Sequence, residues 1–224
     1  MIVVKRGKEP NSLLKFRKEN PDADYEDLTS DVLKDIRNQM WEEQRGLCAY
    51  CMKKIDAPAI VRIEHCRPRH PRDEQEHDKK ATLDFKWMLG VCYGNSLVRG
   101  VKQEEKTCDA HRENAELMVN PFDELSVRKI KYKADGSIYS DDKEINKDVT
   151  ETLNLNCQAL SLPQTREKVL MAEKNRIMRK CKGKSQDAFM RELKRTYASL
   201  VQERNLTPYC GIIISWIESK LKIS

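Results

Sequence analysis

The chain has 224 residues, of which 39% are hydrophobic and 35% charged, and its formal net charge is +6. This composition predicts a globular protein, and the length allows one substantial core or two small ones. The basic excess is compatible with a phosphate-backbone partner, because lysines and arginines that neutralise phosphates release bound counterions. Many proteins without such a partner are equally basic, so the charge alone identifies none.

The sequence contains no segment typical of export or membrane insertion. Its longest apolar stretch, residues 209–217, is shorter than the about 20 residues that a membrane-spanning helix needs. The N-terminal residues hold too short an apolar run for a signal peptide. We therefore expect a cytoplasmic protein. In that reducing compartment, eight cysteines predict metal ligands or buried thiols rather than disulfides.

Apolar residues at helical spacing predict a helix that begins at Thr29 or Ser30 and ends at Gly46, directly before a cysteine pair. Residues 10–21, which precede it, are expected to form a helical turn or an arm. A strand, a charged loop, an apolar segment, a polar insertion and a helix then follow, over residues 59–63, 72–80, 83–92, 94–106 and 109–118.

The remainder of the chain predicts a β-hairpin followed by helices. Two β-prone segments, 127–132 and 137–139, flank Asp135-Gly136, a dipeptide typical of tight hairpin turns. Further helices follow, and the residues that mark their starts or apolar faces are Asp141, Pro163, Leu193 and Thr207-Pro208. In the last of these, threonine is the expected N-cap and proline the first helical residue.

The pair Cys48-Ala-Tyr-Cys51 predicts half of a zinc site. Zinc prefers four tetrahedral thiolate or imidazole ligands, and two cysteines in one tight turn can reach the same ion. Cys92 and Cys108 are the best candidates for the other half, which implies a loop inserted between them. Alternatively, Cys48 and Cys51 are only buried or form a redox pair, although a thioredoxin-like pair would follow a strand. The other cysteines are expected to be core thiols: Cys66, Cys157, Cys181 and Cys210.

Glu64-His65 offers two groups that phosphodiester hydrolysis needs. The reaction requires a base that takes a proton from water and a cation that stabilises the charge developing on the phosphate. A neutral imidazole suits the first role, and an oxygen-bound Mg²⁺ or similar ion suits the second. Neighbours on an extended segment face opposite ways, so one can bind metal while the other addresses the water. The alternative for a lone histidine is a hydrogen-bonded surface or core residue.

The other histidines lie in two different settings. His70 and His77 fall in the charged loop and are expected to be solvated. His111 lies with Asp109 at the start of the helix expected after Cys108, where a helix N-terminus can help to bind a phosphate.

These residues resemble the HNH nucleases found beside retrons and as the PtuB nuclease subunit of Septu antiphage systems. The resemblance extends from about residue 28 to about residue 157. The matching motifs are Gly46-Leu47-Cys48-Ala49-Tyr50-Cys51-Met52, Ile63-Glu64-His65, Met88-Leu89-Gly90-Val91-Cys92, Gly94-Asn95, Thr107-Cys108-Asp109, Asn120-Pro121 and Ile130-Lys131-Tyr132. The resemblance implies a ββα-metal fold held by zinc, DNA as the substrate, and a PtuA-like ATPase subunit as the partner, with or without a retron.

Carried over residue by residue, the resemblance makes His65 the general base and Glu64 its acidic neighbour at a catalytic Mg²⁺ or Mn²⁺. Asp109 stands where these proteins often place the final ligand of that ion, and His111 is a further candidate. Arg112 replaces a lysine and keeps its positive charge near a phosphate. The zinc would be held by Cys48, Cys51, Cys92 and Cys108.

Trp87 is the main departure from the family pattern. It lies five residues before Cys92, where the family has an asparagine that braces the hairpin and orients the base. An indole has one donor and no acceptor, so the change predicts weaker catalysis unless Asn95 or His111 compensates. The alternative function is therefore a catalytically weakened or inactive zinc-stabilised module that binds nucleic acid or a partner protein.

The sequence as a whole predicts an α+β protein with a zinc-stapled ββα-metal core, a mostly helical remainder and an extra β-hairpin. The expected parts are an N-terminal arm with a helix, the HNH core, and the hairpin with the C-terminal helices, over residues 1–46, 47–123 and 124–224. Because the core is small, we expect the last helix, around Ile213, Trp216 and Ile217, to meet a partner subunit or a second copy.

Overall fold

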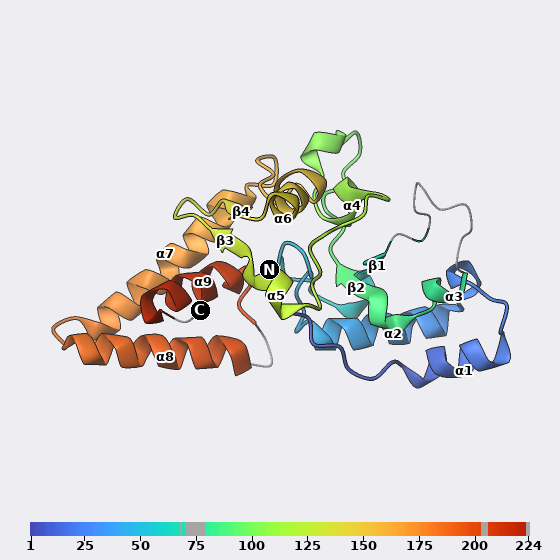
Figure 1. Ribbon diagram of the computed structural model, residues 1–224, viewed down its shortest axis with the longest axis horizontal. Coiled ribbons are helices and arrows are strands. Elements are labelled where there is room, and N and C mark those ends of the chain that lie inside the picture. Colours follow the sequence, from blue (N-terminus) through green and yellow to red (C-terminus); the bar gives the residue numbers. More distant parts are fainter. Residues whose placement is uncertain (68, 70–78, 203–205, 223–224) are drawn as a thin grey trace.

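Helices and short strands make up the described part of the protein. The computed structural model describes residues 1–67, 69, 79–202 and 206–222 (Figure 1). The helices are α1 (Asn11–Glu19), α2 (Ser30–Glu43), α3 (Lys79–Thr82), α4 (Asp109–Arg112), α5 (Glu124–Arg128), α6 (Lys143–Lys147), α7 (Leu162–Cys181), α8 (Gln186–Gln202) and α9 (Cys210–Leu221). The strands are β1 (Arg62–His65), β2 (Met88–Val91), β3 (Ile130–Tyr132) and β4 (Ile138–Ser140). Among the described residues, no helix combines the length and the hydrophobicity that crossing a bilayer requires.

The strands form two separate antiparallel pairs, which confirms the predicted mixture of α and β structure. β1 pairs with β2, so that Glu64 lies opposite Leu89 and His65 lies opposite Met88. β3 pairs with β4, and the predicted Asp135-Gly136 turn connects them. The first pairing brings Glu64 and His65 beside the segment that leads into Cys92.

The predicted helix before the first cysteine pair is confirmed as α2. The hydroxyl group of Thr29 accepts a hydrogen bond from the backbone N–H of Val32 and caps the helix. The apolar face of α2 is buried, and the chain leaves the helix through Arg45 and Gly46, which have φ values of 55° and 73°. This turn carries the chain directly into Cys48.

Two hydrophobic cores divide the chain and meet at residues 47–52. The first contains the buried faces of α1, α2 and both sheets, and the second lies among α7, α8 and α9. Leu47 and Met52 pack in the second core, whereas Cys48 and Tyr50 pack in the first. Figure 1 shows α7, α8 and α9 at one end of the molecule and α1 and α2 at the other.

Two strand and loop predictions need correction. The strand expected over residues 59–63 begins later, as β1, because Pro58–Ile60 forms a turn of 3₁₀ helix after the proline. Most of the expected charged loop, 72–80, lies outside the described residues, and its last two residues open α3.

Two helix boundaries also differ from the predictions. The helix expected over 109–118 is the single turn α4, because Glu113 ends it with a φ of 55°. The last helix begins at Cys210 rather than at Pro208. Tyr209 precedes it in a left-handed conformation, with a φ of 60°, so Thr207 is not the N-cap.

The last helix is packed on the chain itself. Ile213 and Ile217 are buried in the second core, and Trp216 is half-buried against it. Lys174 of α7 lies over the indole ring of Trp216, 5.4 Å from the ring centre. The two isoleucines are therefore not available on the surface, and contact of α9 with a partner or a second copy stays a prediction.

Gly136 marks the closest approach of the β3–β4 turn to α7. Its φ is +81°, and a Cβ atom at this position would lie 1.9 Å from the carbonyl oxygen of Pro163. In the same place, Arg166 Nε donates a hydrogen bond of 2.6 Å to the carbonyl oxygen of Gly136. The hairpin is thus docked on α7 through a contact that leaves no room for a side chain.

Replacing Gly136 by alanine is expected to lower the free energy of unfolding by about 3 kcal/mol, because the left-handed backbone and the clash with Pro163 both oppose a Cβ atom. Gly183→Ala is the matched control, since Gly183 has a φ of +72° but no atom within 4 Å of the new Cβ. The control should lose only about 1 kcal/mol. Urea unfolding measures both values. Equal losses in the two variants would contradict the docking role of Gly136.

Candidate functional site

Four cysteine thiols meet at one point of the structure. The sulfur atoms of Cys48, Cys51, Cys92 and Cys108 all lie within 4.8 Å of one another. The Sγ–Sγ distances are 3.8 Å for Cys48–Cys108, 3.7 Å for Cys51–Cys92 and 3.8 Å for Cys92–Cys108. A tetrahedral ion with metal–sulfur bonds of about 2.3 Å has edges of about 3.8 Å, whereas a disulfide needs about 2.05 Å. The predicted cysteines therefore form a set that fits a metal such as zinc.

The first half of the metal site is a tight turn between two core segments. Cys48 N donates to the carbonyl oxygen of Lys53 at 2.9 Å, and Lys53 N donates to the sulfur of Cys51 at 3.4 Å. Met52, between Cys51 and Lys53, has a φ of 65°, which reverses the direction of the chain. A backbone bond from Ala49 N to the carbonyl oxygen of Gly90, at 3.1 Å, joins this turn to β2.

The second half of the site carries the predicted insertion. Cys92 follows β2, and Cys108 precedes α4, so the chain leaves the site and returns after residues 93–107. Thr107 N donates to the carbonyl oxygen of Gly94 at 3.0 Å, which closes the loop at its base. Gly94 has a φ of +53°, and a Cβ atom there would lie 2.0 Å from the carbonyl oxygen of Thr107. The close approach at this base places Cys92 and Cys108 together despite their separation in sequence.

The thiols affect one another's ionisation. Burial opposes a charge on Cys48, but hydrogen bonds with the other three thiols lower its pKa well below the usual value. Burial raises the pKa of Cys108 well above the usual value, and its contacts with Cys48, Cys51 and Cys92 raise it further. A divalent ion removes this conflict, because a coordinated thiol loses its proton. The remaining cysteines, Cys66, Cys157, Cys181 and Cys210, lie outside the four-thiol cluster.

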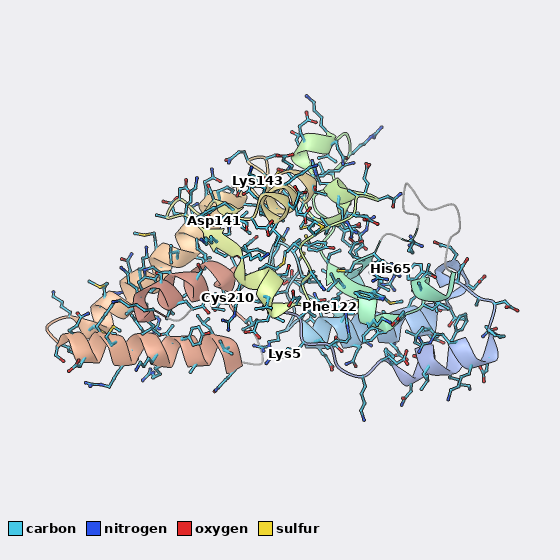
Figure 2. All side chains as sticks on the ribbon, in the orientation of Figure 1. Lys5, His65, Phe122, Asp141, Lys143 and Cys210 are labelled. Carbon is cyan, nitrogen blue, oxygen red and sulfur yellow. The ribbon has the colours of Figure 1, made fainter. Side chains whose placement is uncertain are left out.

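A polar cavity of about 480 Å³ is lined by Asp109, the residue that follows Cys108, whereas none of the four cysteines lines it. Its walls include Glu64, His65 and Asp109, three of the residues expected to take part in catalysis. The other lining residues are Tyr25, Arg37, Val61, Arg62, Ile63, Arg69, Tyr93, Ser96, Lys106, Ala110, Glu113 and Asn114. Figure 2 labels His65, the last residue of β1, well separated from Cys210 of α9. The strand pair and α4 thus bring a base and two carboxyl groups to one cavity.

His65 is held as a neutral imidazole. The residue is 5% exposed, and its Nε2 lies 2.9 Å from the carbonyl oxygen of Thr82. Because a carbonyl oxygen only accepts, Nε2 carries the proton and Nδ1 holds the free lone pair. Burial lowers the pKa of His65 to about 4, against the opposing effect of the Thr82 carbonyl. The ring of Tyr25 meets the imidazole edge-on, with ring centres 4.8 Å apart, and fixes its plane.

The Glu64 carboxyl group accepts hydrogen bonds from Arg112 and Tyr50. Arg112 Nη1 donates to Glu64 Oε1, and the hydroxyl group of Tyr50 donates to the same oxygen at 3.1 Å. Burial raises the pKa of Glu64 to about 8, and the neighbouring Asp109 carboxyl group raises it as well, while Arg112 lowers it. The two carboxyl groups therefore lie close enough to oppose each other's ionisation.

Arg112 lies in the interior of the protein, in contrast to its expected place beside a phosphate. The residue is 3% exposed and does not line the cavity. Besides Glu64, its guanidinium group donates to the carbonyl oxygens of His65 at 2.9 Å, Cys66 at 2.8 Å and Ala115 at 2.7 Å. Arg112 is thus a positioning residue, which ties α4 to the strand that carries Glu64 and His65.

His111 and Trp87 do not join the cavity either. His111 Nδ1 lies 3.0 Å from the carbonyl oxygen of Thr152, and within the described residues no cluster unites His111 with Glu64 and Asp109. The Trp87 ring lies beneath the guanidinium group of Arg67, 4.3 Å from its carbon atom. His70 and His77 lie outside the described residues. Neither His111 nor Asn95 takes the role that the resemblance assigns to an asparagine at His65, since the Thr82 carbonyl oxygen lies at its ring nitrogen.

Three residues of the site were not predicted from the sequence. Tyr50 lies between the paired cysteines, and Tyr25 lies far from them in sequence, so only the fold shows that both reach the strand that carries Glu64 and His65. Arg62 occurs two residues before Glu64, a spacing that places both on one face of a strand. Its Nε lies 2.5 Å from Oδ2 of Asp109.

No family model matches the sequence. Comparison with curated proteins gives no match either.

The metal content of single-cysteine variants tests the four-thiol cluster. Wild-type protein is expected to bind one zinc ion per chain, and Cys108→Ser should lose it, because three thiols remain from a set of four. Loss of the metal should also lower the melting temperature, since a metal ion that binds the folded state stabilises that state. Cys181→Ser is the matched control, because this half-buried thiol lies outside the cluster. Elemental analysis that found equal zinc in both variants would contradict the ligand set.

Removal of Arg112 tests the buried ion pair. Above pH 8, where Glu64 is ionised, Arg112→Ala is expected to lower the free energy of unfolding by about 3–5 kcal/mol, because it leaves the buried carboxylate without its partner. Arg62→Ala should cost about 1 kcal/mol or less, because the ion pair that it removes is half exposed. The double variant Arg112→Ala/Glu64→Gln should recover part of the loss in urea unfolding. If it recovers none, the unpaired carboxylate is not the cause.

Proposed function

We propose that the protein is a metal-dependent HNH-type endonuclease that hydrolyses phosphodiester bonds of DNA. The observation that carries this proposal is the convergence of His65, Glu64 and Asp109 on one cavity, in a protein whose Asp109 directly follows Cys108 of a four-thiol cluster. The order of elements also agrees with it, because an antiparallel strand pair, β1 and β2, precedes the helical turn α4. This order is the one expected for a ββα-metal core.

His65 has the properties of a general base for water. Its ring is neutral near pH 7, since burial holds its pKa at about 4. The bond from Nε2 to Thr82 leaves Nδ1 as the basic nitrogen, and the contact with Tyr25 fixes the ring plane. A positioned neutral imidazole can remove the proton of the attacking water as the P–O bond forms.

Glu64 and Asp109 are the residues that would hold the divalent cation. Adjacent buried carboxyl groups fit Mg²⁺ or Mn²⁺, which prefer oxygen ligands and relieve the repulsion between two negative charges. When bound, the cation stabilises the charge on the phosphate and on the leaving oxygen. His111 is not part of this proposed ligand set, because its ring bonds to Thr152 instead.

Three basic residues of the cavity wall suit a DNA phosphate. Arg37, Arg69 and Lys106 line the cavity together with the catalytic residues. Cationic side chains bind the phosphate backbone independently of base sequence, and they set the register of the strand. We therefore infer contacts to the backbone on both sides of the bond that is cut.

The biological setting is a proposal that follows from the resemblance to retron and Septu nucleases. We propose a nuclease effector of an antiphage system, acting in the cytoplasm with a PtuA-like ATPase subunit, with or without a retron. The four-thiol cluster would hold a structural zinc ion in this protein, separate from the catalytic cation.

Trp87 favours the second candidate function, a zinc-stabilised module that binds nucleic acid or protein without catalysis. Its indole, stacked beneath Arg67 outside the cavity, replaces the asparagine expected to brace the base. Against this stands the Thr82 carbonyl oxygen, which accepts from His65 and supplies an orienting contact. A cleavage assay separates the two candidates.

Nicking of supercoiled plasmid in Mg²⁺ or Mn²⁺ tests the nuclease. His65→Ala is expected to lower the cleavage rate about 10²- to 10⁴-fold, the usual contribution of a general base. His111→Ala is the matched control and should keep the wild-type rate, because His111 does not line the cavity. Equal cleavage by wild type and His65→Ala would exclude the proposed mechanism. Binding of the plasmid without cleavage would favour the module.

A further inference from the structure

Arg62 lies at the point where the cavity meets the candidate metal ligands. It is the first residue of β1, two residues before Glu64, and its side chain is 42% exposed. Its Nε lies 2.5 Å from Oδ2 of Asp109, whose side chain is almost buried. A candidate ligand of the divalent cation is therefore already paired with a cation of the protein itself.

A guanidinium group and a divalent ion compete for a carboxylate in this geometry. Both are positive, so they repel each other strongly at contact distance in a partly buried site. Asp109 Oδ2, at 2.5 Å from Arg62, has little room for an additional ligand bond of about 2.1 Å to Mg²⁺ or Mn²⁺ along the same direction. Binding of the ion from this direction thus requires the arginine to move.

The other arginines of the cavity are engaged differently. Arg37 Nε donates to the carbonyl oxygen of Val61 at 3.2 Å. Arg69 pairs with Glu26 and lies over the ring of Tyr25, 4.5 Å from its centre. Neither pairs with a candidate metal ligand, so Arg37 offers a matched comparison for Arg62.

We propose that Arg62 competes with the divalent cation for Asp109 and, once displaced, binds the DNA phosphate in the cavity. The proposal rests on the nuclease function proposed above. The half-exposed side chain already lies in the cavity wall, and an arginine fork matches phosphate oxygens. A phosphate that receives Arg62 frees Asp109, so DNA and the cation bind cooperatively, each raising the affinity of the other by the same factor.

Binding of Mn²⁺ to the zinc-loaded protein, without DNA, measures the competition directly. Electron paramagnetic resonance reports the free Mn²⁺, and the thiol cluster does not interfere because thiolates select softer metals. Arg62→Ala is expected to bind Mn²⁺ about three- to tenfold more tightly than wild type, since a competing ion pair is removed. Arg37→Ala should bind with wild-type affinity, and Asp109→Asn should bind least.

The same titration with a short DNA duplex measures the cooperativity. In a His65→Ala background, which prevents cleavage, DNA should raise the Mn²⁺ affinity when Arg62 is present. Arg62→Ala in that background should lose this increase, whereas Arg176→Ala, which removes an equally exposed arginine outside the cavity, should retain it. In parallel, the single variant Arg62→Ala should cleave plasmid at least about tenfold more slowly than wild type at saturating Mn²⁺, because a phosphate contact is lost.

Equal Mn²⁺ affinity in wild type and Arg62→Ala would overturn the proposal, and so would weaker binding in Arg62→Ala, which would make Arg62 a support of the site. An undiminished effect of DNA on Mn²⁺ affinity in Arg62→Ala would overturn the phosphate contact. These outcomes differ from failure of the nuclease proposal, which shows as equal plasmid cleavage by wild type and His65→Ala. The melting temperature and zinc content of each variant confirm that it has folded.

Discussion

The convergence of four thiols is the constraint on which the rest of the structure depends. Residues 47–52 lie between the two hydrophobic cores and contribute to both, so the turn that holds Cys48 and Cys51 also joins the two halves of the molecule. The other two cysteines fix the end of β2 and the start of α4. An ion bound there would cross-link three separate segments of the chain, with a stabilising effect that a small core with short strands needs.

Arg112 transmits this constraint to the strand that carries Glu64 and His65. It follows Cys108 by one turn of helix, and its guanidinium group holds Glu64 together with the backbone carbonyl groups of His65 and Cys66. Tyr50, from the first cysteine turn, reaches the same carboxyl group. Two of the segments that the thiols unite therefore position one strand, and the geometry of the cavity lined by Glu64 and His65 follows from the geometry of the thiol cluster.

Short-range patterns in the sequence predicted well wherever the structure is local. The α2 helix, its threonine cap, the Asp135-Gly136 turn and the two-residue cysteine gap depend on neighbours, and all four are present. Predictions failed where distant contacts decide. Arg112 was expected at a phosphate, but its guanidinium group is buried and paired with Glu64. His111, three residues beyond Cys108, forms a hydrogen bond with the carbonyl oxygen of Thr152. Apart from each other, Glu64 and His65 have hydrogen-bond partners 14 to 48 residues away, which no local pattern reveals.

The loop of residues 93–107 leaves the molecule through a narrow neck, and its returning half, residues 103–106, is held by further contacts. Gly94 and Thr107 close it, and Asn154 donates to the carbonyl oxygens of Glu104 and Lys106 at 2.9 Å and 2.8 Å, which anchors the returning strand of the loop. Beyond this neck, Leu97 and Val98 are exposed. Changes in the length of the loop tip are thus insulated from the thiol cluster. Evolution, or an engineer grafting a foreign peptide, can lengthen or replace this tip while the distances between the four sulfur atoms stay the same.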